Sequence, residues 1–174
     1  NKGFEVIEAH HLFNVAFDQI KVLIHRNSIV HSMVEFNDYS ICAQLASADM
    51  HLPINYAING KKHTKCDIIE PLNLNRLTTL SFETLDNERF PLVSVAIDCA
   101  NKGGIYPTIL NAANEVAVWL FLNGFIKFND IVNIINEELN NNEYIKFNNN
   151  LSINRILEVD ELVKHNVKNR KVGK

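Results

Sequence analysis

The sequence has 174 residues, of which 47% are hydrophobic and 21% are charged, and its formal net charge is −3. These fractions are typical of a soluble globular protein, and the slightly acidic balance lacks the basic field that nucleic acid or an anionic membrane attracts. No apolar run approaches the roughly 20 residues that a membrane span needs. We therefore expect that the protein binds neither nucleic acid nor a membrane. The length allows one domain or a small domain with part of another.

The three cysteines point to a reducing compartment. Cys42, Cys66 and Cys99 are odd in number, lie far apart and form no C-x-x-C pair, so the sequence indicates neither a disulfide framework nor a zinc site. The chain opens on Asn1 without a basic n-region or an apolar h-region, which are the marks of a signal peptide. We expect an internal start and a cytoplasmic location.

The first nine residues bring an amide, an ammonium and two carboxylates together at the start of a helix predicted over about 3–15. Asn1 and Glu5 are four apart, and Lys2 and Glu8 each lie three residues from Glu5, so neighbours in this series share a face. A helix N-terminus favours an anion such as phosphate, to which Lys2 and Asn1 would add donors. Glu5 is then a hard oxygen ligand of the kind that Mg²⁺ or Mn²⁺ prefers. The alternative is a solvated first turn of charged residues.

The first 59 residues are predicted to contain two helices with three strands between them. The first helix carries an apolar stripe of Val6, Ala9 and Phe13. Three strands are predicted after it, over residues 20–25, 28–36 and 40–46. The turn at 37–39 between two strand patterns predicts an antiparallel hairpin. A second helix is predicted over 49–59, with Asp49 as its cap.

Helical periodicity dominates the second half of the chain. Residues 60–87 lose the pattern and are predicted to be a linker. Beyond Pro91 the periodicity returns in four segments, over 91–102, 106–123, 128–141 and 153–169. Glycines just past the first two segments are regular stop signals, and the asparagine clusters at 140–142 and 148–150 are typical of surface connections. Four helices with short connections predict a small antiparallel bundle.

These patterns divide the chain into three parts. We expect residues 1–59 to be part of a helix-backed β-sheet domain, residues 60–87 to be the linker, and residues 88–174 to be a small four-helix bundle. The fold class is therefore α+β.

Two further polar groups are assigned ordinary structural roles. His25 and His31 lie on successive predicted strands, without paired carboxylates nearby, so hydrogen bonding is favoured over a metal site. Asn111, Asn114 and Glu115 lie three and four apart in an otherwise apolar helix, and we expect them to satisfy backbone groups rather than to perform chemistry.

Several ungapped motifs together resemble one family, the 1-deoxy-D-xylulose 5-phosphate reductoisomerases. The resemblance runs from residue 1 to about residue 130, and more loosely to the end. The motifs are Asn1-Lys2-Gly3 with Glu5 and Glu8-Ala9, Leu12-Phe13-Asn14, Val22-Leu23-Ile24-His25, Ser28 to Val34, Ala43-Gln44-Leu45, Ala48-Asp49-Met50 with Pro53-Ile54, and Leu110 to Val116.

The resemblance implies an enzyme with an N-terminal NADPH-binding domain, a central catalytic and dimerisation domain and a C-terminal helical domain. Residues 1–59 would belong to the central domain and residues 88–174 to the helical one. Such an enzyme rearranges 1-deoxy-D-xylulose 5-phosphate and reduces the product with NADPH to 2-C-methyl-D-erythritol 4-phosphate, in the non-mevalonate route to isoprenoids. The resemblance also implies that the metal is Mg²⁺ or Mn²⁺ and that the enzyme is a homodimer. It further implies that Met50 contacts the NADPH cofactor.

The same resemblance implies the substrate-binding residues. Asn1 and Lys2 match positions near the substrate phosphate, and Glu5 matches a catalytic position shared between substrate and metal. Ser28 and His31 match substrate-binding positions at the wall of the pocket. The metal would polarise oxygens of the substrate during the rearrangement.

The chain departs from the family pattern in what it lacks. The family's other metal carboxylates, in an Asp-x-Glu arrangement, and its NADPH domain lie upstream of Asn1, and the sequence contains no G-x-G-x-x-G loop. A single carboxylate is a poor Mg²⁺ site. We therefore expect the 174 residues alone to be inactive. Two alternatives stay open, a non-catalytic dimerisation or interaction module and a decayed remnant.

Overall fold

The computed structural model describes residues 1–60 and 62–172, and it has the α+β composition that the sequence predicts. The strands are β1 (Leu23–Ile24), β2 (Val30–Glu35), β3 (Ile41–Leu45) and β4 (Glu83–Thr84). The helices are α1 (Lys2–Phe13), α2 (His51–Ile58), α3 (Pro91–Lys102), α4 (Tyr106–Leu122), α5 (Asp130–Leu139), α6 (Asn142–Ile145) and α7 (Ile153–Val172). Among the described residues no helix is both long and apolar enough to span a membrane.

The chain forms two compact units that differ from the predicted division. One unit joins residues 1–21 to the chain from 86 onward, and the other is residues 22–85. The first helix thus belongs with the C-terminal helices, although the sequence analysis grouped it with the strands. The reason is packing: α1 lies against α3. Compact units need not equal the domains of an enzyme, so the assignment to catalytic and helical domains stays a prediction.

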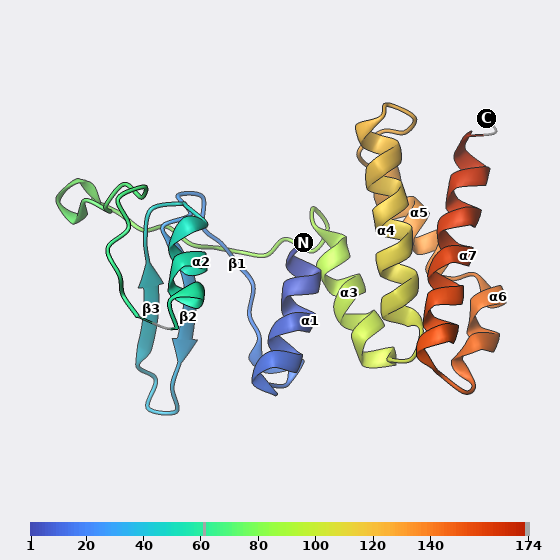
Figure 1. Cartoon of the computed structure of the whole chain (residues 1–174), viewed down its shortest axis with the longest axis horizontal. Coiled ribbons are helices and arrows are strands. Elements are labelled where there is room, and N and C mark those ends of the chain that lie inside the picture. The colour runs from blue at the N-terminus through green and yellow to red at the C-terminus, as the bar shows by residue number, and fades with distance from the viewer. Residues whose placement is uncertain (61, 173–174) are drawn as a thin grey trace. The chain divides into compact units, whose positions relative to one another are not determined.

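The helical unit is built around α4, against which α3, α5 and α7 pack (Figure 1). The buried residues Ile109, Ala113, Ala117 and Leu120 are spaced four, four and three apart, which places them on one face of α4. The four predicted helical segments correspond to α3, α4, α5 and α7. The bounds of α3 agree with the prediction because Pro91 occupies its first turn and the chain leaves it through a glycine at positive φ.

The buried face of α1 includes Gly3 and Val6 but not Phe13, which the sequence predicts to lie on the apolar stripe. Val6 is 3% exposed and Gly3 is also buried, but Phe13 is 73% exposed and Ala9 is half-buried. The predicted stripe of Val6, Ala9 and Phe13 is therefore wrong at its far end. The physical reason is that α1 contacts α3 through its N-terminal half, where a glycine allows the closest approach.

The second unit contains the predicted hairpin but not a three-stranded sheet. Strands β2 and β3 pair antiparallel, with Met33 opposite Ala43. Strand β1 pairs instead with β4, which lies in the segment predicted to be a linker. Arg26 fixes this pairing through two hydrogen bonds to Glu83, Nε to Oε1 at 2.6 Å and Nη2 to Oε2 at 3.1 Å. Strands of two residues are too short to show alternation, so the sequence could not reveal this pair.

The asparagine clusters form more structure than surface connections. The Asn141 side chain accepts a hydrogen bond from the Glu143 N–H at 3.0 Å and so caps the short helix α6. The Asn148 side chain accepts one from the Ile105 N–H at 3.2 Å, just before α4 begins. These contacts secure backbone groups at two helix starts, which the sequence analysis did not foresee.

Candidate functional site

The N-terminal turn of α1 presents the charged face that the spacing predicts. Lys2 Nζ donates to Glu5 Oε2 at 2.5 Å, and the two side chains remain 63% and 49% exposed. Asn1 is the N-cap residue; its carbonyl oxygen accepts from the Glu5 N–H at 3.0 Å, while its side chain makes no capping bond. An amide, an ammonium and a carboxylate are thus accessible at one helix N-terminus, where the backbone dipole favours an anion.

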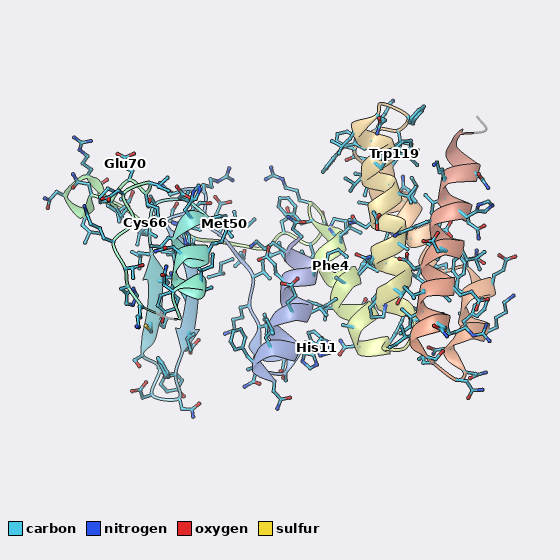
Figure 2. All side chains as sticks on the ribbon, viewed as in Figure 1. Phe4, His11, Met50, Cys66, Glu70 and Trp119 are labelled. Atoms are coloured by element: carbon cyan, nitrogen blue, oxygen red, sulfur yellow. The ribbon has the colours of Figure 1, made fainter. Side chains whose placement is uncertain are left out.

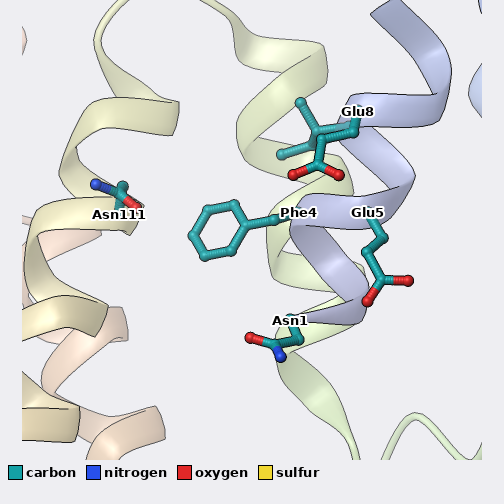
Figure 3. A pocket seen from close by; sticks show the side chains of 6 residues that line it. Asn1, Phe4, Glu5, Glu8 and Asn111 are labelled. Atoms are coloured by element: carbon teal, nitrogen blue, oxygen red, sulfur yellow. The ribbon is translucent and has the colours of Figure 1, made fainter. Parts of the chain in front are cut away.

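A cavity of about 490 Å³ opens beside this turn. Its lining comes from α1 and α4 and consists of Asn1, Phe4, Glu5, Ile7, Glu8 and Asn111. Figure 3 shows the Phe4 ring pointing from α1 toward α4, with the amide of Asn111 on the facing helix. The cavity combines an apolar wall with carboxylates and two amides, which suits a small polar molecule with a carbon skeleton.

Asn111 lies at the cavity and not, as the sequence predicts, against backbone groups. It was expected to serve buried backbone, but its side chain is exposed and lines the cavity. Its neighbours Leu110 and Ala112 are 3% and 0% exposed, so a polar residue directly between buried ones is the signal that could have identified it. Glu115 does have an architectural contact, because its Oε2 lies 2.8 Å from Lys164 Nζ on α7.

The donors on α1 fit a divalent metal in kind but not in number. The carboxylates of Glu5 and Glu8 and the amide oxygen of Asn1 are the hard oxygen ligands that Mg²⁺ and Mn²⁺ prefer. Within residues 1–60 and 62–172, however, no three His, Cys, Asp or Glu side chains gather closely enough to hold a metal ion. Glu5 can therefore be one ligand of such a site, with others needed from elsewhere.

Ser28 and His31 lie together in the second unit. Ser28 has a φ of 49°, a left-handed conformation that a non-glycine residue seldom adopts. His31 Nε2 donates to the Ser28 carbonyl oxygen at 3.0 Å, and both side chains are exposed. The imidazole of His31 thus contacts the residue with the unusual backbone conformation, and the substrate-binding role of Ser28 and His31 stays a prediction.

Met50 stands at the start of α2, where its side chain is 70% exposed (Figure 2). Asp49 anchors this turn, since its Oδ1 accepts from the His51 N–H at 2.8 Å and from His51 Nδ1 at 2.6 Å. These two hydrogen bonds, the backbone one first, lower the pKa of the Asp49 carboxyl. Asp49 was predicted to cap this helix, and it satisfies a first-turn N–H although the N-cap position itself is Met50.

His25 has the polar structural role that the sequence analysis favoured. Its Nδ1 donates to the Ser81 carbonyl oxygen at 2.7 Å, and its ring stacks on Phe82 with centroids 4.8 Å apart. The contact ties the end of β1 to the segment that leads into β4.

Comparisons with known proteins agree on one family. The family model described as the DXP reductoisomerase C-terminal domain matches residues 45–166. A 1-deoxy-D-xylulose 5-phosphate reductoisomerase from Clostridium novyi (strain NT) is 49% identical over 172 residues, which cover 98% of this chain and 43% of the relative. The corresponding protein of an Exiguobacterium species is 44% identical over 167 residues, which cover 96% of this chain and 43% of the relative.

Solved structures give the same result. A 1-deoxy-D-xylulose 5-phosphate reductoisomerase from Zymomonas mobilis in complex with NADPH superimposes with a TM-score of 0.82 at 34% identity, covering 98% of this chain and 44% of that one. A DOX-P reductoisomerase in complex with NADPH, fosmidomycin and magnesium gives a TM-score of 0.91 at 37% identity, covering 97% and 42%. The chain thus spans less than half the length of the relatives that it matches.

Proposed function

We propose that this chain, which belongs to the 1-deoxy-D-xylulose 5-phosphate reductoisomerase family, is the carboxyl-terminal part of an enzyme that converts 1-deoxy-D-xylulose 5-phosphate to 2-C-methyl-D-erythritol 4-phosphate with NADPH. This places it in the non-mevalonate route to isoprenoids. The observation that carries the proposal is the face of α1, where Asn1 and Glu5 line one cavity and Lys2 forms an ion pair with Glu5.

Asn1 and Lys2 bind the phosphate end of the sugar in this proposal. The N-terminal N–H groups of α1 point toward an anion at this position, and the exposed ammonium of Lys2 adds a charge-assisted donor. Binding a phosphate there competes with the Lys2–Glu5 ion pair. The carboxylate of Glu5 is then released toward the rest of the substrate.

Glu5 is the one metal ligand that the described residues contribute. A bound Mg²⁺ or Mn²⁺ supplies Lewis-acid polarisation of substrate oxygens. Glu5 would be one ligand of the ion, and it is the residue for which we propose a catalytic role. The other ligands would come from a part of the enzyme that this chain does not include, as would most of the NADPH site.

Ser28 and His31 bind the substrate in this proposal, and Met50 contacts the cofactor. The exposed imidazole and hydroxyl are suited to hydrogen bonds with the substrate, and the polarisable thioether of Met50 is suited to contact with the cofactor. Two contacts support this assignment: His31 donates to the Ser28 carbonyl oxygen, and Asp49 accepts from the N–H of His51 beside Met50, while these side chains remain accessible.

We also propose a cytoplasmic homodimer. Val34 and Ile41 on the β2–β3 hairpin are 55% and 62% exposed, and strand faces of this kind are commonly covered by further strands or by a second subunit. The free thiols and the NADPH chemistry are consistent with a reducing compartment.

The direct test is a chimera. The part of the Clostridium novyi enzyme that precedes its matched 172 residues is joined in front of Asn1, and NADPH oxidation is followed with and without 1-deoxy-D-xylulose 5-phosphate and Mg²⁺. We expect substrate-dependent and metal-dependent oxidation by the chimera and none by the 174-residue chain. Activity of the chain alone would contradict the proposed division of the site. A folded but inactive chimera would contradict the enzyme proposal and favour the interaction module.

A matched pair of substitutions tests Glu5. Glu5→Gln keeps the shape of the side chain and removes its charge, so we expect at least about a 100-fold fall in kcat/KM and a raised Mg²⁺ requirement. Glu137→Gln makes the same change on the exposed surface of α5 and should leave both unchanged. Equal activity of the two variants would remove Glu5 from the chemistry.

A further inference from the structure

Gly3 lies between Lys2 and Glu5 in the sequence, but its Cα faces α3. A Cβ built on Gly3 would lie 2.5 Å from the Cβ of Ala96 and 3.2 Å from the carbonyl oxygen of Leu92, both on α3. Real Cβ atoms essentially never approach another heavy atom within 3.0 Å. The close approach of the two helices therefore depends on the absence of a side chain at position 3.

The residues around Gly3 extend this contact into the core. Val6, one turn further along α1, is 3% exposed, and Ala96 is 2% exposed. Phe4 and Ile7 pack against the buried cluster that centres on α4. One side of α1 is thus fixed to the helical unit, while Lys2 and Glu5 on the other side remain about half exposed or more.

We propose that Gly3 is a positioning residue: the absence of a side chain there sets the distance between α1 and α3, and with it where Asn1, Lys2 and Glu5 stand. The inference rests on the proposed function, and it assigns the helical unit a role in the geometry of the site. Because Asn1, Lys2 and Glu5 flank Gly3 within one turn or so, any displacement of α1 at position 3 moves all three together.

The expected consequence follows from the distances. A methyl group at position 3 must be accommodated by a shift of roughly half an ångström or more between α1 and α3, since the Cβ of Ala96 cannot rotate away and the Leu92 oxygen belongs to the backbone. A misplacement of about 1 Å can lower a rate about 100-fold. Gly3→Ala should therefore lower kcat/KM by about 10-fold to 100-fold and raise the Mg²⁺ concentration needed for half-maximal activity.

The test uses three variants in the active chimera: Gly3→Ala, Ala96→Gly and the double variant. Removing the methyl of Ala96 makes room for the methyl at position 3, so the double variant should recover at least about tenfold of the lost kcat/KM, although it carries one more substitution. Ala96→Gly alone is the matched control and should stay near the parent in both kcat/KM and Mg²⁺ requirement. Circular dichroism confirms that each variant is folded.

A second readout does not depend on catalysis. In the 174-residue chain, the urea midpoint should fall for Gly3→Ala and be partly restored in the double variant. A folded Gly3→Ala chimera with unchanged kcat/KM and Mg²⁺ requirement would overturn the proposal, as would a double variant that recovers nothing. An inactive parent chimera, by contrast, contradicts the proposed function, and the urea cycle still decides whether the α1–α3 contact exists.

Discussion

The two units of this chain differ in what they bury. In the helical unit sixteen hydrophobic residues with exposures of at most 7% form one cluster, which runs from Ala96 to Val167. In residues 22–85, over the part that the structure describes, only Ala46 is buried, at 7% exposure. Large apolar side chains such as Phe36 and Ile58 are 53% and 78% exposed there.

This difference in burial predicts that the two units differ in stability. The helical unit has a core of its own and holds α1, and with it Asn1, Lys2 and Glu5. The unit with Ser28, His31 and Met50 buries little by itself, and its strands present unpaired edges. We expect the first set of residues to be ordered in the chain alone and the second set to depend on additional protein.

Cysteine labelling should give the largest contrast between the units. Cys99 on α3 is 2% exposed, and burial raises the pKa of its thiol to about 11, whereas Cys42 on β3 is exposed. At pH 8 only about one in a thousand Cys99 thiols would be ionised, against about one in four for a thiol with the ordinary pKa of about 8.5. Alkylation of Cys99 should therefore be at least about a hundredfold slower than that of Cys42, and burial slows it further. Mass spectrometry after iodoacetamide treatment measures both.

The same pKa has a consequence for stability. Because the pKa of the Cys99 thiol is raised above the value of about 8.5 for an unfolded thiol, its contribution to stability is complete below that pH and is lost as the pH rises toward 11.

Rapid labelling of Cys99 at pH 8 without denaturant would contradict the labelling prediction, because it would show that the helical core opens easily.

A substitution in the core should give the next largest difference between the units, measured as the free energy of unfolding. Leu120 on α4 is fully buried, so Leu120→Ala should lower the free energy of unfolding by about 2 to 5 kcal/mol. Ile41→Ala on the exposed face of the hairpin should change it by no more than about 0.5 kcal/mol. Urea denaturation followed by circular dichroism compares them, and equal losses would contradict the contrast.

A buried polar contact should give the smallest of the three effects. The Tyr144 hydroxyl donates to Glu138 Oε2 and accepts from Asn166 Nδ2 at 2.9 Å, and Tyr144 is fully buried. Tyr144→Phe removes both bonds and should lower the free energy of unfolding by about 1 to 3 kcal/mol. Tyr39→Phe, at an 84% exposed position of the hairpin, is the matched control and should have no measurable effect.

Much of the fold could be predicted because local signals mark it. Pro91 and Gly103 delimit α3 to the residue, and the β2–β3 hairpin follows from alternation on both sides of its turn. The shared face of Lys2 and Glu5 follows from a spacing of three on a helix. These features depend on neighbours in the sequence, and the structure confirms each of them.

The rest depends on contacts between distant segments. The pairing of β1 with β4 joins residues some sixty positions apart, as in Leu23 opposite Thr84, and leaves no local pattern. The grouping of α1 with α3 and the place of Asn111 at the cavity likewise arise only when helices pack. The burial of Glu138, which is 1% exposed, also lacks a local signal, because the Tyr144 hydroxyl that donates to its carboxyl group lies on another helix.

Hydrogen exchange of the 174-residue chain tests most directly whether the helical unit holds α1, with Asn1, Lys2 and Glu5, in place. We expect the amides of α1 from Val6 onward to exchange slowly together with those of α3 and α4, and those of β2 and β3 to exchange much faster. Fast exchange throughout α1, at the rate of the hairpin, would show that α1 is not docked and would contradict the account.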